Sequence, residues 1–146
     1  MRRVVALVAL LVLVNGCTQE DDMDLQERAE ARAVEARSHI DDLAARIGAE
    51  PPEVRQDKLT DCVPGQEDSG LDLVYTLRVA VDPGAADRLR GEIADHFESE
   101  GWQVKRDPDS GTVVSVRFQK DTFTIGAKVS EADGQATVGG SGGCVR

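Results

Sequence analysis

The feature that most constrains the fold is a run of alternating apolar and polar residues from Leu71 to Val81. Successive side chains of a β-strand point to opposite faces, so this run predicts a strand with one buried face. The segments 112–119 and 122–130 alternate in the same way, and 102–105 and 135–140 predict two shorter strands. A sheet with one apolar face has to bury that face against a second layer.

One long segment with helical periodicity can contribute to that layer. It spans 24–47, where Asp24 and Glu27 predict a capping box and Gly48 ends the helix. Its apolar residues recur at helical spacing and are mostly small in the first half: Ala29, Ala33, Ala36, Ile40, Leu43 and Ile47. We expect the second half to dock on the domain and the first half to form a stalk. Self-association as a coiled coil is the alternative.

A second helix is predicted after Asp82-Pro83, with Asp82 as the N-cap and Pro83 at the first helical position. It ends at Gly101, and its apolar stripe contains Ala86, Leu89, Ile93 and Phe97. Residues 49–70 contain several Pro and Gly residues and are expected to form a loop. The sequence therefore predicts an α+β fold: an N-terminal stalk helix (24–48), then β-α-β-β-β in residues 71–146, with the short segment 135–140 as a last, weak strand. The helices pack on one face of a mainly antiparallel sheet.

The N-terminus predicts an export signal. Arg2 and Arg3 precede an unbroken apolar run of eleven residues from Val4 to Val14. A membrane-spanning helix needs roughly 20 apolar residues, whereas a shorter run is typical of a signal-peptide core. The run continues Asn15-Gly16-Cys17, and the motif from Val14 to Cys17 resembles the lipobox of bacterial lipoproteins.

That resemblance implies that residues 1–16 are a cleaved signal peptide and that Cys17 carries a diacylglyceryl group. Residues 17–23 would then be an acidic tether to the outer side of the cell membrane, and the membrane would be the first partner of the chain. Together with the stalk helix and the α+β domain, the chain resembles small cell-envelope lipoproteins of actinobacteria.

Two cysteines remain once Cys17 is assigned to the lipid. Cys62 and Cys144 form an even pair in an oxidising compartment, so we expect a disulfide between them. Such a bridge would place the entry to the strand at Leu71 beside the exit of the last strand. A metal pair is the alternative. It lacks a Cys-x-x-Cys spacing, and only His39 and His96 could complete it, so we expect no metal ion.

Charge and motifs exclude several classes of function. A formal net charge of -10 argues against nucleic-acid binding, which needs a basic surface. No phosphate-binding loop or dinucleotide fingerprint is present, and we expect no cofactor. The stretch Gly139–Gly143 formally matches Gly-x-Ser-x-Gly but has no acid and histidine after it, and we interpret it as a flexible tail. His39 and His96 are interpreted as surface residues.

The alternation also predicts the outward face of the sheet. Its polar and basic residues are Thr76, Arg78, Lys105, Ser115, Arg117, Thr124 and Lys128. An exposed antiparallel face can be solvated or can bind a partner such as an envelope protein or a glycan. We expect a non-enzymatic binding or scaffolding module. A hydrolase that acts on the envelope and a structural protein that self-assembles through the helix at 24–47 remain alternatives.

Overall fold

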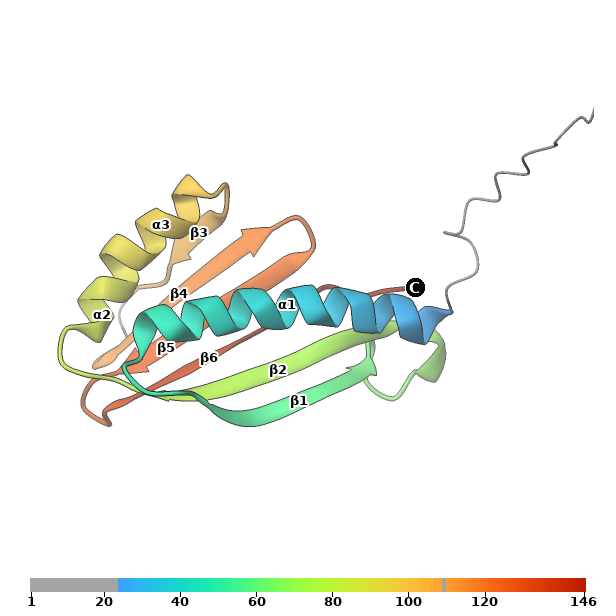
Figure 1. Cartoon of the computed structure of the whole chain (residues 1–146), viewed down its shortest axis with the longest axis horizontal. Helices are drawn as coiled ribbons and strands as arrows, with labels where there is room; N and C mark the ends of the chain where they lie inside the picture. Colours follow the sequence, from blue (N-terminus) through green and yellow to red (C-terminus); the bar gives the residue numbers. More distant parts are fainter. Residues whose placement is uncertain (1–23, 109) are drawn as a thin grey trace, which may run out of the picture.

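The computed structural model describes residues 24–108 and 110–146, which form a six-stranded sheet with helices on one face (Figure 1). The predicted α+β class is confirmed. The elements are α1 (Leu25–Ile47), β1 (Glu53–Asp61), a 3-10 turn (Glu67–Ser69), β2 (Leu71–Ala80), α2 (Ala85–Arg88), a π-helical turn (Leu89–Ile93), α3 (Ala94–Ser99), β3 (Gln103–Arg106), β4 (Val113–Lys120), β5 (Phe123–Ser130) and β6 (Gln135–Ser141).

All neighbouring strands are antiparallel, in the order β1-β2-β6-β5-β4-β3. The last strand lies beside β2, and the disulfide joins Cys62 to Cys144 with their Cα atoms 5.6 Å apart. The predicted disulfide is therefore confirmed. The C-terminal segment is tied down further, because Val145 pairs with Leu71 through two backbone hydrogen bonds. The interpretation of Gly139–Gly143 as a flexible tail is wrong, since it includes the end of β6.

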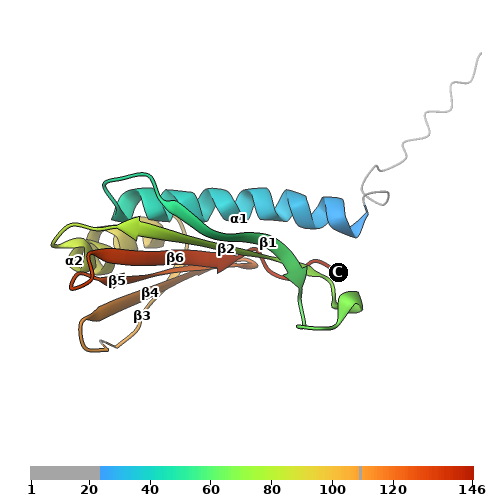
Figure 2. The same ribbon diagram turned by 90° about the horizontal axis from the view of Figure 1, so that it is seen from below.

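Helix α1 crosses the inner face of the sheet and docks along its whole described length (Figures 1 and 2). Ile40 and Leu43 in its second half are fully buried, as expected. In its first half, Ala29 and Ala33 are only 2% and 1% exposed, so the expected free stalk is wrong. The apolar stripe that could have formed a coiled coil is covered by the chain's own sheet.

The small residues of α1 allow this close docking. A Cβ atom added to Gly142 would lie 2.9 Å from the Arg32 side chain and 3.4 Å from Ala36 Cβ. Alanine on the helix and glycine beyond the end of β6 thus let the two backbones approach. The predicted N-cap of α1 is present, because the backbone N–H of Glu27 donates to Asp24 Oδ1 at 2.8 Å.

The expected loop at 49–70 is wrong, because it contains strand β1 at one edge of the sheet. Its two apolar residues, Val54 and Leu59, are five positions apart and would lie on opposite faces of a regular strand. A β-bulge between Val54 and Gln56 changes the phase. Val54 then lies opposite Leu77 and Leu59 opposite Leu73, so both occupy the inner face. The extra residue in the bulge interrupts the alternation of inward and outward residues from which a strand is predicted.

The start of the second helical segment also differs from expectation. Helix α2 begins at Ala85, and its N-cap is Gly84, with φ at 90°, instead of Asp82. The cap comes from the turn after β5: Glu131 Oε1 accepts hydrogen bonds from the backbone N–H groups of Gly84 and Ala86, each at 2.9 Å. A carboxylate at a helix N-terminus satisfies free N–H groups and opposes the helix dipole. The predicted apolar residues Leu89, Ile93 and Phe97 are buried.

Candidate functional site

The second face of the sheet is the candidate site, because no described element packs over it. Helix α1 contacts β2, β6, β5 and β1, and the shorter helical segments contact β3, β4 and β5 on the same inner face (Figure 2). The buried apolar side chains of the strands point to that face. The alternate residues therefore point to the outer face.

Strand register places the outer residues in rows that run across the strands. In one row, Lys128 of β5 lies between Ser115 of β4 and Thr137 of β6. Arg78 of β2 continues this row beyond Thr137. A single ammonium group is thus flanked on both sides by hydroxyl-bearing side chains.

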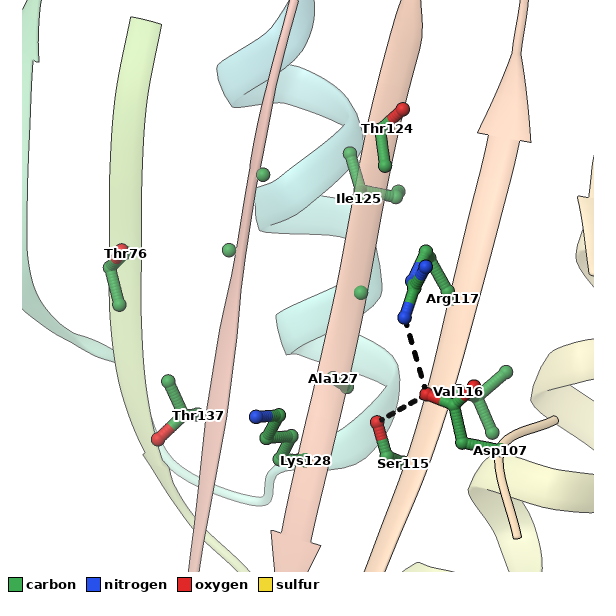
Figure 3. A pocket seen from close by; sticks show the side chains of 13 residues that line it. Thr76, Asp107, Ser115, Val116, Arg117, Thr124, Ile125, Ala127, Lys128 and Thr137 are labelled. Carbon is green, nitrogen blue, oxygen red and sulfur yellow. Dashed lines mark hydrogen bonds and ion pairs between the residues drawn. The ribbon is translucent and has the colours of Figure 1, made fainter. Parts of the chain in front are cut away.

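The next row contains two adjacent glycines. Gly126 of β5 pairs with Gly139 of β6, and the row continues to Thr76 on β2 and to Arg117 on β4. Because neither glycine has a side chain, the surface between Thr76 and Arg117 is lowered to the level of the backbone. The result is an open hollow of about 430 Å³ on the outer face (Figure 3).

Both arginines predicted for this face have ion-pair partners, whereas one lysine in the hollow has none among the described residues. Arg117 Nη2 lies 3.5 Å from Asp107 Oδ2, and the Ser115 hydroxyl donates to the same oxygen at 3.2 Å (Figure 3). Outside the hollow, Arg78 Nη1 lies 3.8 Å from Glu53 Oε2. Lys128 is exposed, and no hydrogen bond or ion pair within residues 24–108 and 110–146 engages its ammonium group. It is the cation in the hollow that is available to a ligand.

The structure brings together five of the seven outward residues named from the sequence: Thr76, Ser115, Arg117, Thr124 and Lys128 all line the hollow. Arg78 and Lys105 share the face but lie outside it. Sequence reasoning missed Asp107, Thr137 and the glycine pair. The glycine pair could have been noticed in the sequence, because Gly126 and Gly139 occupy outward positions in their alternating segments.

Other chemistry-bearing residues are held in structural roles. The Ser141 hydroxyl donates to Asp72 Oδ2 at 2.5 Å and accepts from the Gly143 N–H at 3.0 Å. It lies at the end of a strand and not at a strand-to-helix elbow. The hollow itself is lined by one carboxylate, Asp107, and by no histidine. Within the described residues no cluster of potential metal ligands occurs.

The histidines are half-buried, and their interpretation as surface residues needs correction. The His39 ring packs edge-on against Trp102 and Phe123, with ring centroids 5.0 and 5.1 Å apart. His96 packs against Phe97 at 5.6 Å, and its Nε2 lies 3.5 Å from Glu100 Oε1. Both rings extend the inner aromatic cluster, on the opposite side of the sheet from the hollow.

Tyr75 joins the inner face to α1. Its hydroxyl donates to Asp41 Oδ1 at 2.9 Å. Burial of the ring, and then this hydrogen bond and the Asp41 charge, raise the pKa of Tyr75 to about 12. All three effects favour the neutral phenol over the phenolate.

Cys17, the predicted signal peptide (1–16) and the predicted tether (17–23) lie outside the described residues. Within the described part of the chain, none of the helices has the length and apolar character to cross a membrane. Comparisons with models of protein families, with curated proteins and with solved structures found no match.

Proposed function

We propose that the chain is an extracytoplasmic lipoprotein that binds a partner through the outer face of its sheet. The observation that carries this proposal is the glycine-floored hollow on the face that no described element covers. Antiparallel sheets commonly leave one face to solvent, but an ordinary solvated face is filled by side chains. On this face the two central strands, β5 and β6, have no side chains at Gly126 and Gly139.

Part of the reason for these glycines lies within the sheet, because a Cβ added to Gly139 would lie 2.8 Å from the Tyr75 carbonyl oxygen and one added to Gly126 would lie 3.0 Å from the Val116 carbonyl oxygen. Glycine in a strand interior weakens the strand and often marks a place where another backbone or a ligand approaches closely. Inside the molecule, Gly142 has such a neighbour in Ala36 of α1. Gly126 and Gly139 also border the open hollow, where their lack of side chains would let a bound partner reach the backbone.

The location of the module is proposed from the sequence. The lipobox resemblance at Val14–Cys17 supports a lipid anchor on Cys17, and the Cys62–Cys144 disulfide is consistent with an oxidising compartment. Two acyl chains give stable membrane attachment. Helix α1 begins at Leu25, eight positions after Cys17, so the anchor would hold the binding face close to the membrane.

The anchor is tested by labelling cells with a clickable palmitate analogue. The wild-type chain should take up the label and sediment with membranes, because each buried methylene contributes about 0.8 kcal/mol. The Cys17→Ser variant should do neither. A Cys17→Ser chain that still sediments with membranes after its signal peptide has been removed would show that the anchor is elsewhere.

The binding face is tested by site-specific photo-cross-linking in the same cells. A photo-reactive residue at Thr137, which is exposed at the hollow, should give a discrete cross-linked species. The matched control places the same residue at Ser38, which is exposed on α1. Equal yields from the two positions, or no product from Thr137, would contradict the proposal.

A further inference from the structure

The outer face gathers positive charge in a chain whose net charge is -10. Lys105 of β3 lies directly opposite Arg117 of β4, and Lys128 lies on the neighbouring strand β5. Like charges directly opposite each other in a sheet are destabilising. Asp107 offsets part of this repulsion through Arg117. An anion bound beside Lys128 would offset more of it, so the hollow favours an anionic ligand.

Asp107 shows which kind of anion these groups can hold. Its carboxylate lies at the rim of the hollow, with Oδ2 near Arg117 and the Ser115 hydroxyl. Lys128 lies beside the Thr137 hydroxyl and has no carboxylate partner among the described residues, whereas the Ser115 hydroxyl on its other side already donates to Asp107 (Figure 3). The hollow therefore offers a second carboxylate position beside the one that Asp107 already fills.

The shape of the hollow favours an extended chain over a sugar. From β2 to β4 it crosses three interstrand spacings, about 14 Å in all, which is the length of roughly four residues of extended peptide. The hydroxyl groups of Thr76, Thr124 and Thr137 line it and can pair with peptide groups. None of its lining residues is aromatic, so it offers no ring on which a sugar could stack.

We infer that the hollow binds an extended, acidic peptide segment of the partner protein, with one carboxylate on Lys128 and the peptide backbone over Gly126 and Gly139. The inference rests on the proposed binding function and specifies the chemistry of its partner. The glycines matter because only a surface without side chains lets a peptide backbone come within reach of the threonine hydroxyls.

The test uses residues 18–146 with the disulfide intact and a peptide that carries fluorescein on its N-terminus, fluoresceinyl-Gly-Glu-Gly-Glu-Gly-amide. Fluorescence anisotropy should show saturable binding that weakens with added salt. The Lys128→Gln variant should bind roughly tenfold more weakly, as expected for the loss of a hydrogen bond to a charged group. The matched control is Lys58→Gln. Lys58 is exposed on the outer side of the edge strand β1, and its substitution should leave affinity unchanged.

A second measurement locates the peptide. In a ¹⁵N–¹H spectrum the backbone amides of Gly126 and Gly139 should shift during the titration, and those of α1 should not. Shifts confined to other elements would overturn the inference. So would equal weakening by Lys58→Gln, or equal binding of a peptide with Gln in place of Glu.

The outcomes also separate this inference from the proposed function. If the peptide fails to bind and an oligogalacturonate binds instead, the ligand is an acidic glycan and the peptide inference is wrong. If the peptide fails while cross-linking from Thr137 persists in cells, the face binds a partner of other chemistry. If both fail, the proposed function is wrong as well.

Discussion

On the helix-covered side of the sheet, strands β2, β4, β5 and β6 present apolar side chains that are almost entirely buried. The outer side of the same strands presents threonine, serine, glycine, lysine and arginine. Both faces share one backbone and one register, so they differ only in the alternate residues. The inner residues are those that folding requires, because apolar burial is the main favourable contribution to stability.

Glycine occurs on both faces. On the inner side Gly140 has no room for a side chain, since an added Cβ would lie 2.4 Å from the Thr124 carbonyl oxygen. The outer hollow at Gly126 is open to solvent, although an added Cβ there would lie 3.0 Å from the Val116 carbonyl oxygen. At the other outer glycine, Gly139, an added Cβ would lie 2.8 Å from the Tyr75 carbonyl oxygen, so close backbone contacts restrict all three positions and only the outer pair also shapes an open surface. Residues that folding does not require are the ones to examine for function.

The largest expected loss of stability comes from removing the disulfide, which joins the segment before β2 to the segment after β6. The double variant Cys62→Ala, Cys144→Ala opens a loop with a sequence separation of 82. The chain-entropy model gives a loss of about 4.5 kcal/mol in the free energy of unfolding. Urea denaturation followed by Trp102 fluorescence measures it. A loss below about 1 kcal/mol would show that the backbone pairing of Val145 with Leu71 suffices to hold this end.

The contrast between the faces is tested by one matched pair of substitutions. Leu43→Ala on α1 removes a fully buried side chain and should cost about 2–5 kcal/mol. Thr124→Val on the outer face keeps the shape and β-branching and should change stability by less than about 0.5 kcal/mol. The same urea denaturation gives both values. Similar losses would mean that the outer face also contributes to the stability of the fold.

We expect a smaller loss of stability when the helix cap provided by Glu131 is removed. Glu131→Ala removes the cap that bonds the N–H groups of Gly84 and Ala86, and should cost about 1 kcal/mol. Glu131→Gln keeps an acceptor oxygen and should restore part of the loss. The control is Glu92→Ala, which removes an exposed carboxylate from the same helical segment. If the two alanine variants are equally stable, the capping bonds contribute nothing measurable.

Most of the fold could be predicted from the sequence, because alternation and helical spacing record which side of an element is buried. This information was sufficient for α1, β2, β4 and β5. Strand β1 was missed because its bulge shifts the phase between Val54 and Leu59. The cap of α2 was missed because Glu131 is distant in sequence from Gly84. A contact between remote segments leaves no local pattern.

The candidate site was predictable in part for the same reason. Alternation identified the outward residues, including Lys128 and Arg117, since it decides which face a side chain occupies. It could not identify the row in which Gly126 lies beside Gly139, because that depends on strand order and register. The position of Asp107 over Ser115 likewise follows from the turn between β3 and β4.

Substitution of Tyr75 should cause the smallest loss of stability at neutral pH and should change how stability depends on pH above 10. Tyr75→Phe removes the hydrogen bond to Asp41, an exposed carboxylate that water can solvate again, so we expect a loss of less than about 1 kcal/mol at pH 7. The pKa of Tyr75 is about 12 in the folded protein, against 10.0 for an ordinary tyrosine. The unfolded chain therefore loses its proton first as the pH rises.

The stability that comes from the neutral phenol is complete below pH 10 and is lost as the pH rises from 10 towards 12. Tyr75 is the only tyrosine, so its absorbance near 295 nm reports this titration directly. We expect a midpoint near 12 in the folded protein and near 10 in urea. The wild type should lose more stability than Tyr75→Phe over this range. A folded midpoint near 10 would show that the Tyr75–Asp41 contact does not hold α1 to the inner face in solution.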